Sequence, residues 1–413
     1  MSKLKQIEID DMPNGWQEHI LSEVITVNPQ RDLKKGSLVK FVSMADLNAF
    51  DKEIRGGVFR EFSGGSKFIN GDTLMARITP CLENGKTVFV DILEENEVAG
   101  GSTEFIVLSG KEGKTINEFV YYLTISPEIR QKVIQSMTGT SGRQRVENDI
   151  FKKIIINLPA IDEQYAITKI LSDLDTKIEI NHQMNKILES IAQTLFKRWF
   201  VDFEFPGYER TKFVNGLPEG WAEAKLGDFV DILNGFAFKS EDFVGSGVFL
   251  LRTRNFTEDG YVMRDDTACL PESFYDEYKG FRLKKFDVLL VMVGASVGKM
   301  AMVQSSVLPA LQNQNMWNFR YKNSAGQLFL NFLVKKIVQE NLGTASGSAR
   351  DFFRKDYFRS IDFILPDERV LKDFDKQAST MFDQIDKNLT EIGILSQIRD
   401  SLLPKLMTGE LAV

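Results

Sequence analysis

The chain has 413 residues, of which 43% are hydrophobic and 26% charged, as expected for a globular protein of two or more domains. No apolar run approaches the roughly 20 residues that span a bilayer, and the N-terminal residues lack the apolar core of a signal peptide, so we expect a cytoplasmic protein without membrane contact. Two cysteines and two histidines argue against a disulfide framework, a thiolate zinc site or a histidine-based metal centre, so no metal is expected.

The net charge of −7 is unlike that of a typical nucleic-acid-binding protein, but its distribution matters more than its total. Most of the acidic excess lies in two long helical stretches, so the remaining segments are close to neutral. Nearly neutral domains can present a basic face that composition does not reveal. Charge therefore leaves nucleic-acid binding open.

The chain is a tandem repeat, because the same local signals return in the same order about 200 residues later. Each half opens with a Pro-x-Gly-Trp turn, at 13–16 and at 218–221, whose tryptophan is expected to anchor the turn in a core. Apolar runs typical of strands follow, at 39–42 and at 248–251. The spacing between matching signals is constant at the ends of the repeat and varies in the middle. This pattern indicates one scaffold with loops of different length, and such loops commonly carry binding specificity.

A long helix is predicted from Ile161 to about Phe200, and a second helix repeats its pattern near the C-terminus. Apolar residues recur at alternating steps of four and three, the rhythm of a coiled-coil seam. One such stripe also fits an ordinary core helix, but two copies in register favour a pair of helices. Asn181 and Asn388 occupy equivalent seam positions, which suits an antiparallel pair with a pseudo-twofold axis. The predicted seam comprises Ile167, Leu171, Leu174, Ile178, Asn181, Leu188 and Leu195, followed by Phe374, Met381, Ile385, Asn388, Leu395 and Leu402.

The predicted segments are a first domain at 1–158, a central spacer helix at 159–205, a second domain at 206–364 and a C-terminal spacer helix at 365–413. Each helix follows an apolar run and a Leu-Pro pair. We expect an α+β fold class with two similar domains separated by long antiparallel coiled-coil helices.

Two stretches approach a phosphate-binding loop without matching it. Residues 80–87 lack the first glycine of the motif, and 294–300 are one residue short and end in Met300 where a magnesium-binding hydroxyl belongs. We interpret both as glycine-rich turns between strands, each with a lysine at its edge. The sequence also contains no nucleophile elbow, no zinc-ligand spacing and no Asn-Pro-Pro-aromatic tetrapeptide, since Asn28-Pro29-Gln30 falls short.

Polar loops at matching places in the two halves are the candidate DNA contacts. Glycines and small hydroxyl residues expose backbone N–H groups to phosphates, while Arg, Gln and Asn can read base edges. Each loop alone is better explained as a solvated loop. Their recurrence keeps the functional interpretation open for these residues: Arg77, Lys86, Ser141, Arg143, Gln144, Arg145, Arg252, Arg254, Asn255, Lys299, Gln312, Asn313, Gln314, Asn315, Ser346, Ser348 and Arg350.

The order of turn, variable domain, glycine–hydroxyl loop, Leu-Pro pair and long helix, given twice, resembles the specificity subunit (HsdS) of type I restriction–modification enzymes over nearly the whole chain. The segment 158–164 is close to the Leu-Pro-x-x-x-Glu-Gln opening of that family's central helix, and 401–411 is close to its usual ending. The second helix departs from the pattern, since 367–369 replace the Glu-Gln pair. Ala349 also stands where the first half has Gln144, so a polar contact there is not carried into the second half.

The resemblance implies a non-catalytic subunit with two target recognition domains, each reading one half of a split site in double-stranded DNA. It implies that the helices set the gap between the halves and dock two methyltransferase subunits, and that restriction subunits join the full complex. The chain itself would bind no cofactor, with S-adenosylmethionine and ATP on the partner subunits. Two alternatives of other classes are a nucleotide-binding enzyme and a coiled-coil scaffold without DNA binding.

Overall fold

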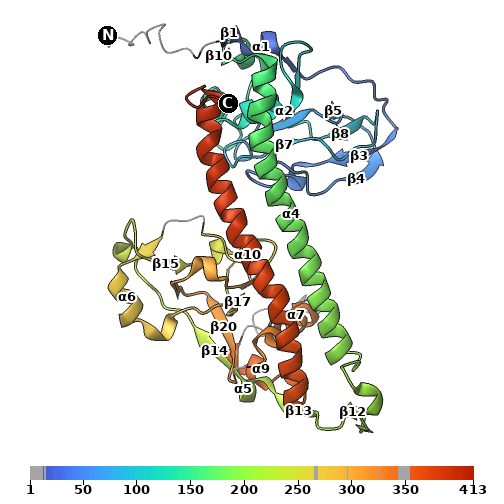
Figure 1. Cartoon of the computed structure of the whole chain (residues 1–413), viewed down its shortest axis with the longest axis vertical. Coiled ribbons are helices and arrows are strands. Elements are labelled where there is room, and N and C mark those ends of the chain that lie inside the picture. Colours follow the sequence, from blue (N-terminus) through green and yellow to red (C-terminus); the bar gives the residue numbers. More distant parts are fainter. Residues whose placement is uncertain (1–12, 14, 265–267, 295, 324, 343–353) are drawn as a thin grey trace. The chain divides into compact units, whose positions relative to one another are not determined.

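The computed structural model describes residues 13, 15–264, 268–294, 296–323, 325–342 and 354–413. Its contacts group the chain into unit 1, Met1–Glu179 with Ile392–Val413, and unit 2, Ile180–Glu391. Two helices of 40 residues each, α4 (Ile161–Phe200) and α10 (Glu368–Met407), contribute one part to each unit. In Figure 1 they are the long green and red helices that lie side by side. The segments predicted from the sequence place each long helix in a segment of its own. The contacts instead divide each long helix between the two units.

Unit 1 is an α+β domain with two four-stranded sheets. Its elements before α4 are β1 (Gln17–Ile20), α1 (Leu21–Val24), β2 (Ile25–Val27), β3 (Leu38–Val42), β4 (Val58–Glu61), β5 (Ser66–Phe68), β6 (Thr73–Ala76), β7 (Thr87–Phe89), β8 (Ala99–Gly101), β9 (Phe105–Gly110), α2 (Asn117–Ile125), α3 (Pro127–Gln135) and β10 (Ile155–Leu158). The first sheet has the order β2–β9–β6–β7, with antiparallel neighbours. The second has the order β4–β3–β8–β5, in which β3 and β8 are parallel. Strands β1 and β10 form a separate antiparallel pair.

Unit 2 repeats this plan. Its elements between the helices are β11 (Phe213–Val214), β12 (Leu217–Pro218), β13 (Ala222–Lys225), α5 (Leu226–Phe229), β14 (Val230–Asn234), β15 (Val248–Leu251), β16 (Cys269–Leu270), α6 (Glu272–Glu277), β17 (Val288–Val291), β18 (Met300–Met302), β19 (Ala310–Gln312), β20 (Met316–Tyr321), α7 (Gln327–Leu342), α9 (Lys355–Ser360) and β21 (Asp362–Leu365). The sheet β14–β20–β17–β18 has the same order and directions as β2–β9–β6–β7. The parallel pair β15–β19 matches β3–β8, and β13–β21 matches β1–β10. The predicted fold class is confirmed, because both halves build one α+β scaffold next to a pair of long antiparallel helices.

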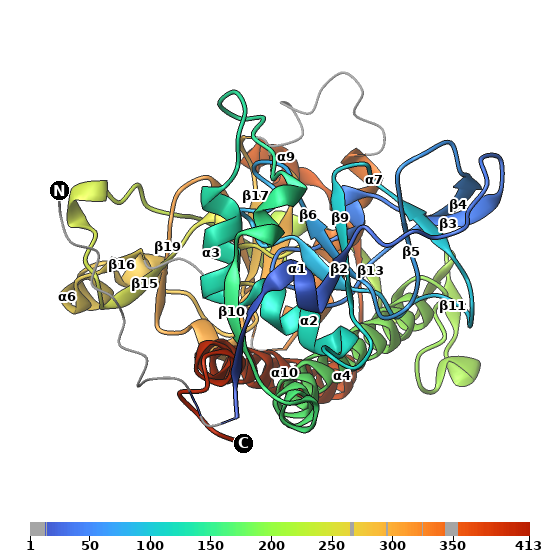
Figure 2. The ribbon, with the colours of Figure 1, turned by 90° about the horizontal axis from the view of Figure 1, so that it is seen from above.

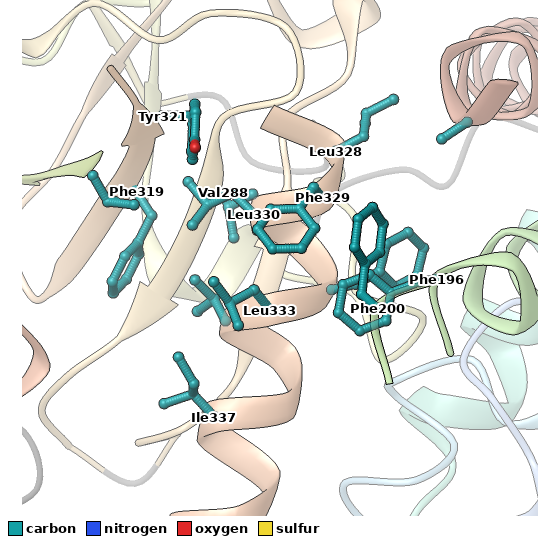
Figure 3. Packing of buried hydrophobic residues seen from close by; sticks show 14 of the residues in the cluster. Phe196, Phe200, Val288, Phe319, Tyr321, Leu328, Phe329, Leu330, Leu333 and Ile337 are labelled. Atoms are coloured by element: carbon teal, nitrogen blue, oxygen red, sulfur yellow. The ribbon is translucent and has the colours of Figure 1, made fainter. Parts of the chain in front are cut away.

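In each unit a helix lies between the first sheet and α4. In unit 1 this helix is α2, whose Tyr122 hydroxyl donates a hydrogen bond to Asp175 of α4 at 2.7 Å. Figure 2 shows α2 between α4 and the strands β2, β9 and β6. In unit 2 the helix is α7, and Figure 3 shows Phe329 of α7 packed against Phe196 and Phe200 of α4. The ends of α4 and α10 therefore belong to the domain cores.

Both tryptophan turns are confirmed. The Trp16 N–H donates to the Pro13 carbonyl at 3.1 Å, and the Trp221 N–H donates to Pro218 at 3.0 Å. Each turn has a glycine at φ +89°, where a side chain would be strained. Both indoles are buried in their cores, at 5% and 7% exposed.

The helices pair in antiparallel fashion, because partners on α10 move towards its N-terminus as positions on α4 advance. In unit 1, Arg399 donates to Asp175 at 2.7 Å. In unit 2, the Asn181 amide donates to Glu391 and the Asn388 amide donates to Asn185, both at 2.8 Å. All the seam positions predicted from the sequence are buried or half-buried on the two helices.

Candidate nucleic-acid interface

The loop that ends the first domain is a small hairpin. Thr138 and Arg145 form an antiparallel bridge, with backbone hydrogen bonds of 3.0 Å and 2.8 Å. Glycines at φ +127° and +78° let the chain reverse between them. The tip carries Ser141 and Arg143, both exposed, while Gln144 is half-buried. The hairpin thus presents a hydroxyl and a guanidinium to solvent.

The base of this hairpin is joined to the segment after β6. The Val146 N–H donates to the Arg77 carbonyl at 2.8 Å, and the Arg77 guanidinium donates back to the Val146 carbonyl at 2.6 Å. The Thr79 N–H donates to the Gln144 carbonyl at 3.0 Å. The structure therefore brings Arg77 together with Ser141, Arg143, Gln144 and Arg145, although the sequence separates them.

Arg145 is an anchor of the hairpin. Its guanidinium donates to both oxygens of Glu104, with distances of 2.7 to 3.1 Å. These hydrogen bonds lower the pKa of Glu104 and raise the pKa of Arg145, so the pair stays ionised over the physiological range. A bidentate pair of this kind fixes the geometry of a loop. Arg143, two residues before Arg145, has an exposed side chain and is better placed to reach a ligand.

Beside this hairpin lies an open cleft of about 570 Å³, here called the basic cleft, whose lining includes Arg31, Lys67 and Arg77. Arg31 donates to the buried carboxylate of Asp72 at 2.9 Å. The Lys67 ammonium donates to the Leu33 carbonyl at 2.9 Å. Arg31 and Lys67 are absent from the candidates predicted from the sequence. The one local signal for Arg31 was the polar turn Asn28-Pro29-Gln30 before it, which also lines the cleft.

The two glycine–lysine turns lie elsewhere. They join β6 to β7 and β17 to β18, which are antiparallel pairs, so the interpretation as turns between strands is confirmed. A phosphate-binding loop instead leads from a strand into a helix whose N-terminus holds the phosphate. Lys86 donates to the Met44 carbonyl at 2.8 Å, and Lys299 is paired with Glu258 at 2.6 Å. Neither lysine lines the basic cleft.

Two predicted contacts in unit 2 are corrected by the structure. Asn255 is 1% exposed, and its side-chain oxygen accepts the Arg252 N–H at 2.8 Å to close a 3-10 turn. Asp46 closes the matching turn in unit 1, accepting from Ser43 at 2.7 Å. Gln312 is 2% exposed, and its amide donates to the Met316 carbonyl at 3.0 Å. Asn255 and Gln312 offer no surface to DNA, so we remove both from the candidate set.

The remaining unit 2 candidates lie on two connections. Arg252 and Arg254 follow β15, where Arg254 is exposed and Arg252 half-buried. Asn313, Gln314 and Asn315 join β19 to β20, and the last two are exposed. This connection matches the one that carries Glu104 in unit 1. Three further candidates lie outside the described residues: Ser346, Ser348 and Arg350.

Comparison with known proteins gives the family. The model for the type I restriction modification DNA specificity domain matches residues 13–190 and again residues 218–400. The chain belongs to this family. Each of the two matched ranges contains one copy of the α+β scaffold and most of the long helix that follows it.

Two relatives of this chain match about three quarters and nearly all of its length. The type I restriction enzyme HindI specificity subunit of Haemophilus influenzae is 24% identical over 470 residues, covering 96% of this chain and 100% of that protein. The MjaIX specificity subunit of Methanocaldococcus jannaschii is 25% identical over 323 residues, covering 73% and 71%. The solved structure of the type I restriction-modification S subunit from M. genitalium has the same fold, with a TM-score of 0.58 and 16% identity over 97% of this chain and 98% of that one.

Among the described residues of this specificity-family chain, no group of three or more His, Cys, Asp or Glu side chains is arranged to hold a metal ion. Within the same part of the chain, no helix is long and apolar enough to cross a membrane.

Proposed function

We propose that this chain is the sequence-specific DNA-recognition subunit of a type I restriction–modification complex, and that each domain reads one half of a bipartite target in double-stranded DNA. One observation carries the proposal. The two units repeat one strand order, yet matching connections carry different polar side chains, such as Glu104 in unit 1 and Asn315 in unit 2. A shared scaffold with different loops is the arrangement expected when two related domains read different bases.

We assign no catalytic step to the chain. The turns that approach phosphate-binding loops connect antiparallel strands, and their lysines are held by a backbone carbonyl and by Glu258. In this proposal methyl transfer with S-adenosylmethionine and ATP-dependent restriction take place on partner subunits. The chain contributes the choice of DNA sequence.

The helices are proposed to dock two methyltransferase subunits, which restriction subunits then join. The supporting feature is a second apolar stripe on α4, formed by Ile180, Met184, Ile187 and Ile191, which are 38% to 60% exposed. The four residues lie one position before Asn181, Asn185, Leu188 and Ala192, which are buried or half-buried, so the stripe lies about 100° around the helix from that inward face. Exposed apolar stripes of this kind mark protein–protein contacts. Replacing Ile187 and Ile191 with Ser should weaken capture of a type I methyltransferase subunit, whereas Thr194→Ser on the same helix should not.

Selection of bound duplexes from a random library would test DNA recognition. The full chain, assembled with a type I methyltransferase subunit, should enrich two short sequences at a fixed separation. Enrichment of a single uninterrupted sequence, or of none, would contradict two-domain reading and favour a scaffold without DNA binding.

A helix insertion would test the proposed spacing role. Because Asp175 faces Arg399 and Asn185 faces Asn388, Ile178 lies opposite Leu395. One heptad inserted after Ile178 and one after Leu395 keeps the seam in phase and lengthens both helices by ~10 Å. Since DNA rises ~3.4 Å per base pair, the unread gap should grow by about three base pairs. Those pairs also rotate the duplex by about a third of a turn, so affinity should fall. An unchanged gap would refute the spacing role.

A further inference from the structure

We propose that the basic cleft of unit 1 binds a phosphodiester group of the DNA backbone through Lys67 and Arg77, with Arg31 beside them, and that unit 2 holds its half-site without this contact. The inference rests on the proposed function and adds that the two units hold the DNA by different kinds of contact. The first half-site would be held partly by an ionic contact that salt weakens. The second would be held at the matching place by aromatic and apolar side chains.

Lys67 and Arg77 have N–H donors that make no hydrogen bond within the described part of the protein. The Lys67 ammonium has three donors and uses two of them on the carbonyls of Leu33 and Arg31, at 2.9 Å and 3.3 Å. Arg77 donates through one terminal nitrogen to the Val146 carbonyl. Unused donors on charged groups that share a cleft suit an anion with several oxygens.

Two of the acidic groups near the cleft are each paired with a single arginine, and neither is paired with Lys67. Asp72 is fully buried and is paired with Arg31. Glu104 is paired with Arg145 at 2.7 Å. A third acid, Glu147, lies 4.0 Å from Arg77 and is largely exposed. The ammonium of Lys67 has no carboxylate within ion-pair distance in the described structure, so it supplies the cleft with a positive charge that is not neutralised locally.

Unit 2 lacks this arrangement at the same place in its scaffold. Arg77 follows the last residue of β6, and its N–H donates to the Glu104 carbonyl at 2.9 Å. Met292 follows β17, and its N–H donates to the Asn315 carbonyl at 3.1 Å. The two positions therefore match, with a thioether in place of a guanidinium.

The other two cleft cations also differ in unit 2. Arg31 stands four residues beyond Val27, and Phe236 stands four residues beyond Ile232, which occupies the same place as Val27 in its sheet. Phe236 is 36% exposed and packs against Tyr278 at 4.9 Å between ring centroids.

The backbone of Lys67 pairs with strand β8. At the matching place in unit 2, the backbone of Arg282 pairs with strand β19. The guanidinium of Arg282 is held by Asp276 and lies over the Tyr275 ring. At the matching place, unit 2 therefore presents an exposed phenylalanine and an arginine whose charge is already paired.

The test is the salt dependence of binding by the full chain to the duplex that the wild type selects. The logarithm of the binding constant falls with the logarithm of salt concentration by about 0.9 for each neutralised phosphate. Arg77→Met, which installs the residue of unit 2, and Lys67→Met should each reduce this slope by up to about 0.9. Between about 50 and about 200 mM salt, the affinity of such a variant should fall about 3.5-fold less than that of the wild type. Arg31 is left in place because it pairs with a buried carboxylate.

Lys132→Met is the matched control. It removes one positive charge from the exposed surface of α3, where Lys132 pairs with Glu128 at 2.6 Å and does not line the cleft. Its salt slope should equal that of the wild type, and circular dichroism should show all three variants folded. Folded cleft variants that keep the full slope, or a control that loses as much slope as they do, would overturn the phosphate site while DNA recognition stands. Failure of the wild type to select any duplex would instead overturn the proposed function and this inference with it.

Discussion

Replacing Asn388 with leucine should destabilise unit 2, although leucine is the usual seam residue. Asn388 and Asn185 are 3% and 6% exposed, and the Asn388 amide donates to the Asn185 oxygen at 2.8 Å. Gln384 donates to the Asn388 oxygen at 2.7 Å. Asn388→Leu removes both bonds and leaves the side-chain oxygen of Asn185 buried without a donor. An orphaned buried polar group costs about 1–3 kcal/mol, so we expect a loss of about 2 kcal/mol.

Removing both amides should reverse that loss. In Asn185→Leu/Asn388→Leu no buried amide remains on this layer, and burial of each leucine contributes about 1.5–3 kcal/mol. The double variant should therefore be at least as stable as the wild type. Because polar seam residues fix register and partner number, it should also form additional oligomers.

Scanning calorimetry and analytical ultracentrifugation measure both effects. For a unit of roughly 200 residues, a loss of about 2 kcal/mol lowers the melting temperature by about 4–8 °C. Lys387→Leu is the control, because Lys387 is the exposed neighbour of Asn388 and its replacement adds an apolar side chain outside the seam. The reasoning is refuted if Asn388→Leu melts at or above the wild-type temperature as a single monomeric species.

Three further outcomes are expected. Arg399→Met leaves the carboxylate of Asp175, 6% exposed, without its cation and should cost about 3–5 kcal/mol in thermal unfolding; Asp175→Asn/Arg399→Met should cost less. Burial raises the pKa of Glu53 from 4.5 to about 7, so the stability that its neutral form contributes is complete below pH 4.5 and is lost as the pH rises through 7. Glu53→Gln should remove that loss and be more stable than the wild type at pH 8 by about 1 kcal/mol, a value reduced for solvent screening, with no difference at pH 4 in urea unfolding. Arg143→Ala should lower DNA affinity by about 1–3 kcal/mol in fluorescence anisotropy without changing the melting temperature, whereas Arg145→Ala should also lower the melting temperature, because it releases the hairpin.

The repeat and its helices could be predicted because their signals are local. A seam rhythm over many turns specifies a helix and its inward face, and α4 occupies Ile161–Phe200 as the pattern indicated. The tryptophan turns were equally readable, since a glycine with positive φ two residues after a proline defines the turn. Composition and pattern were also sufficient to reject the phosphate-binding loops.

The candidate DNA contacts were harder to predict, because residue type does not say which way a side chain points. Asn255 and Gln312 have the chemistry of base-reading groups, yet one closes a turn and the other ends a buried strand. Lys67 and Arg77 meet at one cleft only because β5 and β6 belong to sheets that the fold brings together. No local feature of the sequence indicates that these two residues lie at the same cleft.

The buried aspartates show how one scaffold accommodates different loops. Asp72 and Asp287 end the same kind of turn, each accepting the N–H of the residue three positions earlier, at 3.0 Å and 2.8 Å. Both carboxylates are buried and each needs a cation, but they obtain it from different places. In unit 1 the cation is Arg31, from the loop that lines the basic cleft. In unit 2 the cation is Arg320, which belongs to strand β20. The loop position that matches Arg31 therefore does not need to neutralise the buried aspartate, and Phe236 occupies it. A loop residue can therefore change its chemistry wherever the scaffold supplies the buried charge from another element, and this is the condition under which two copies of a domain can recognise different DNA.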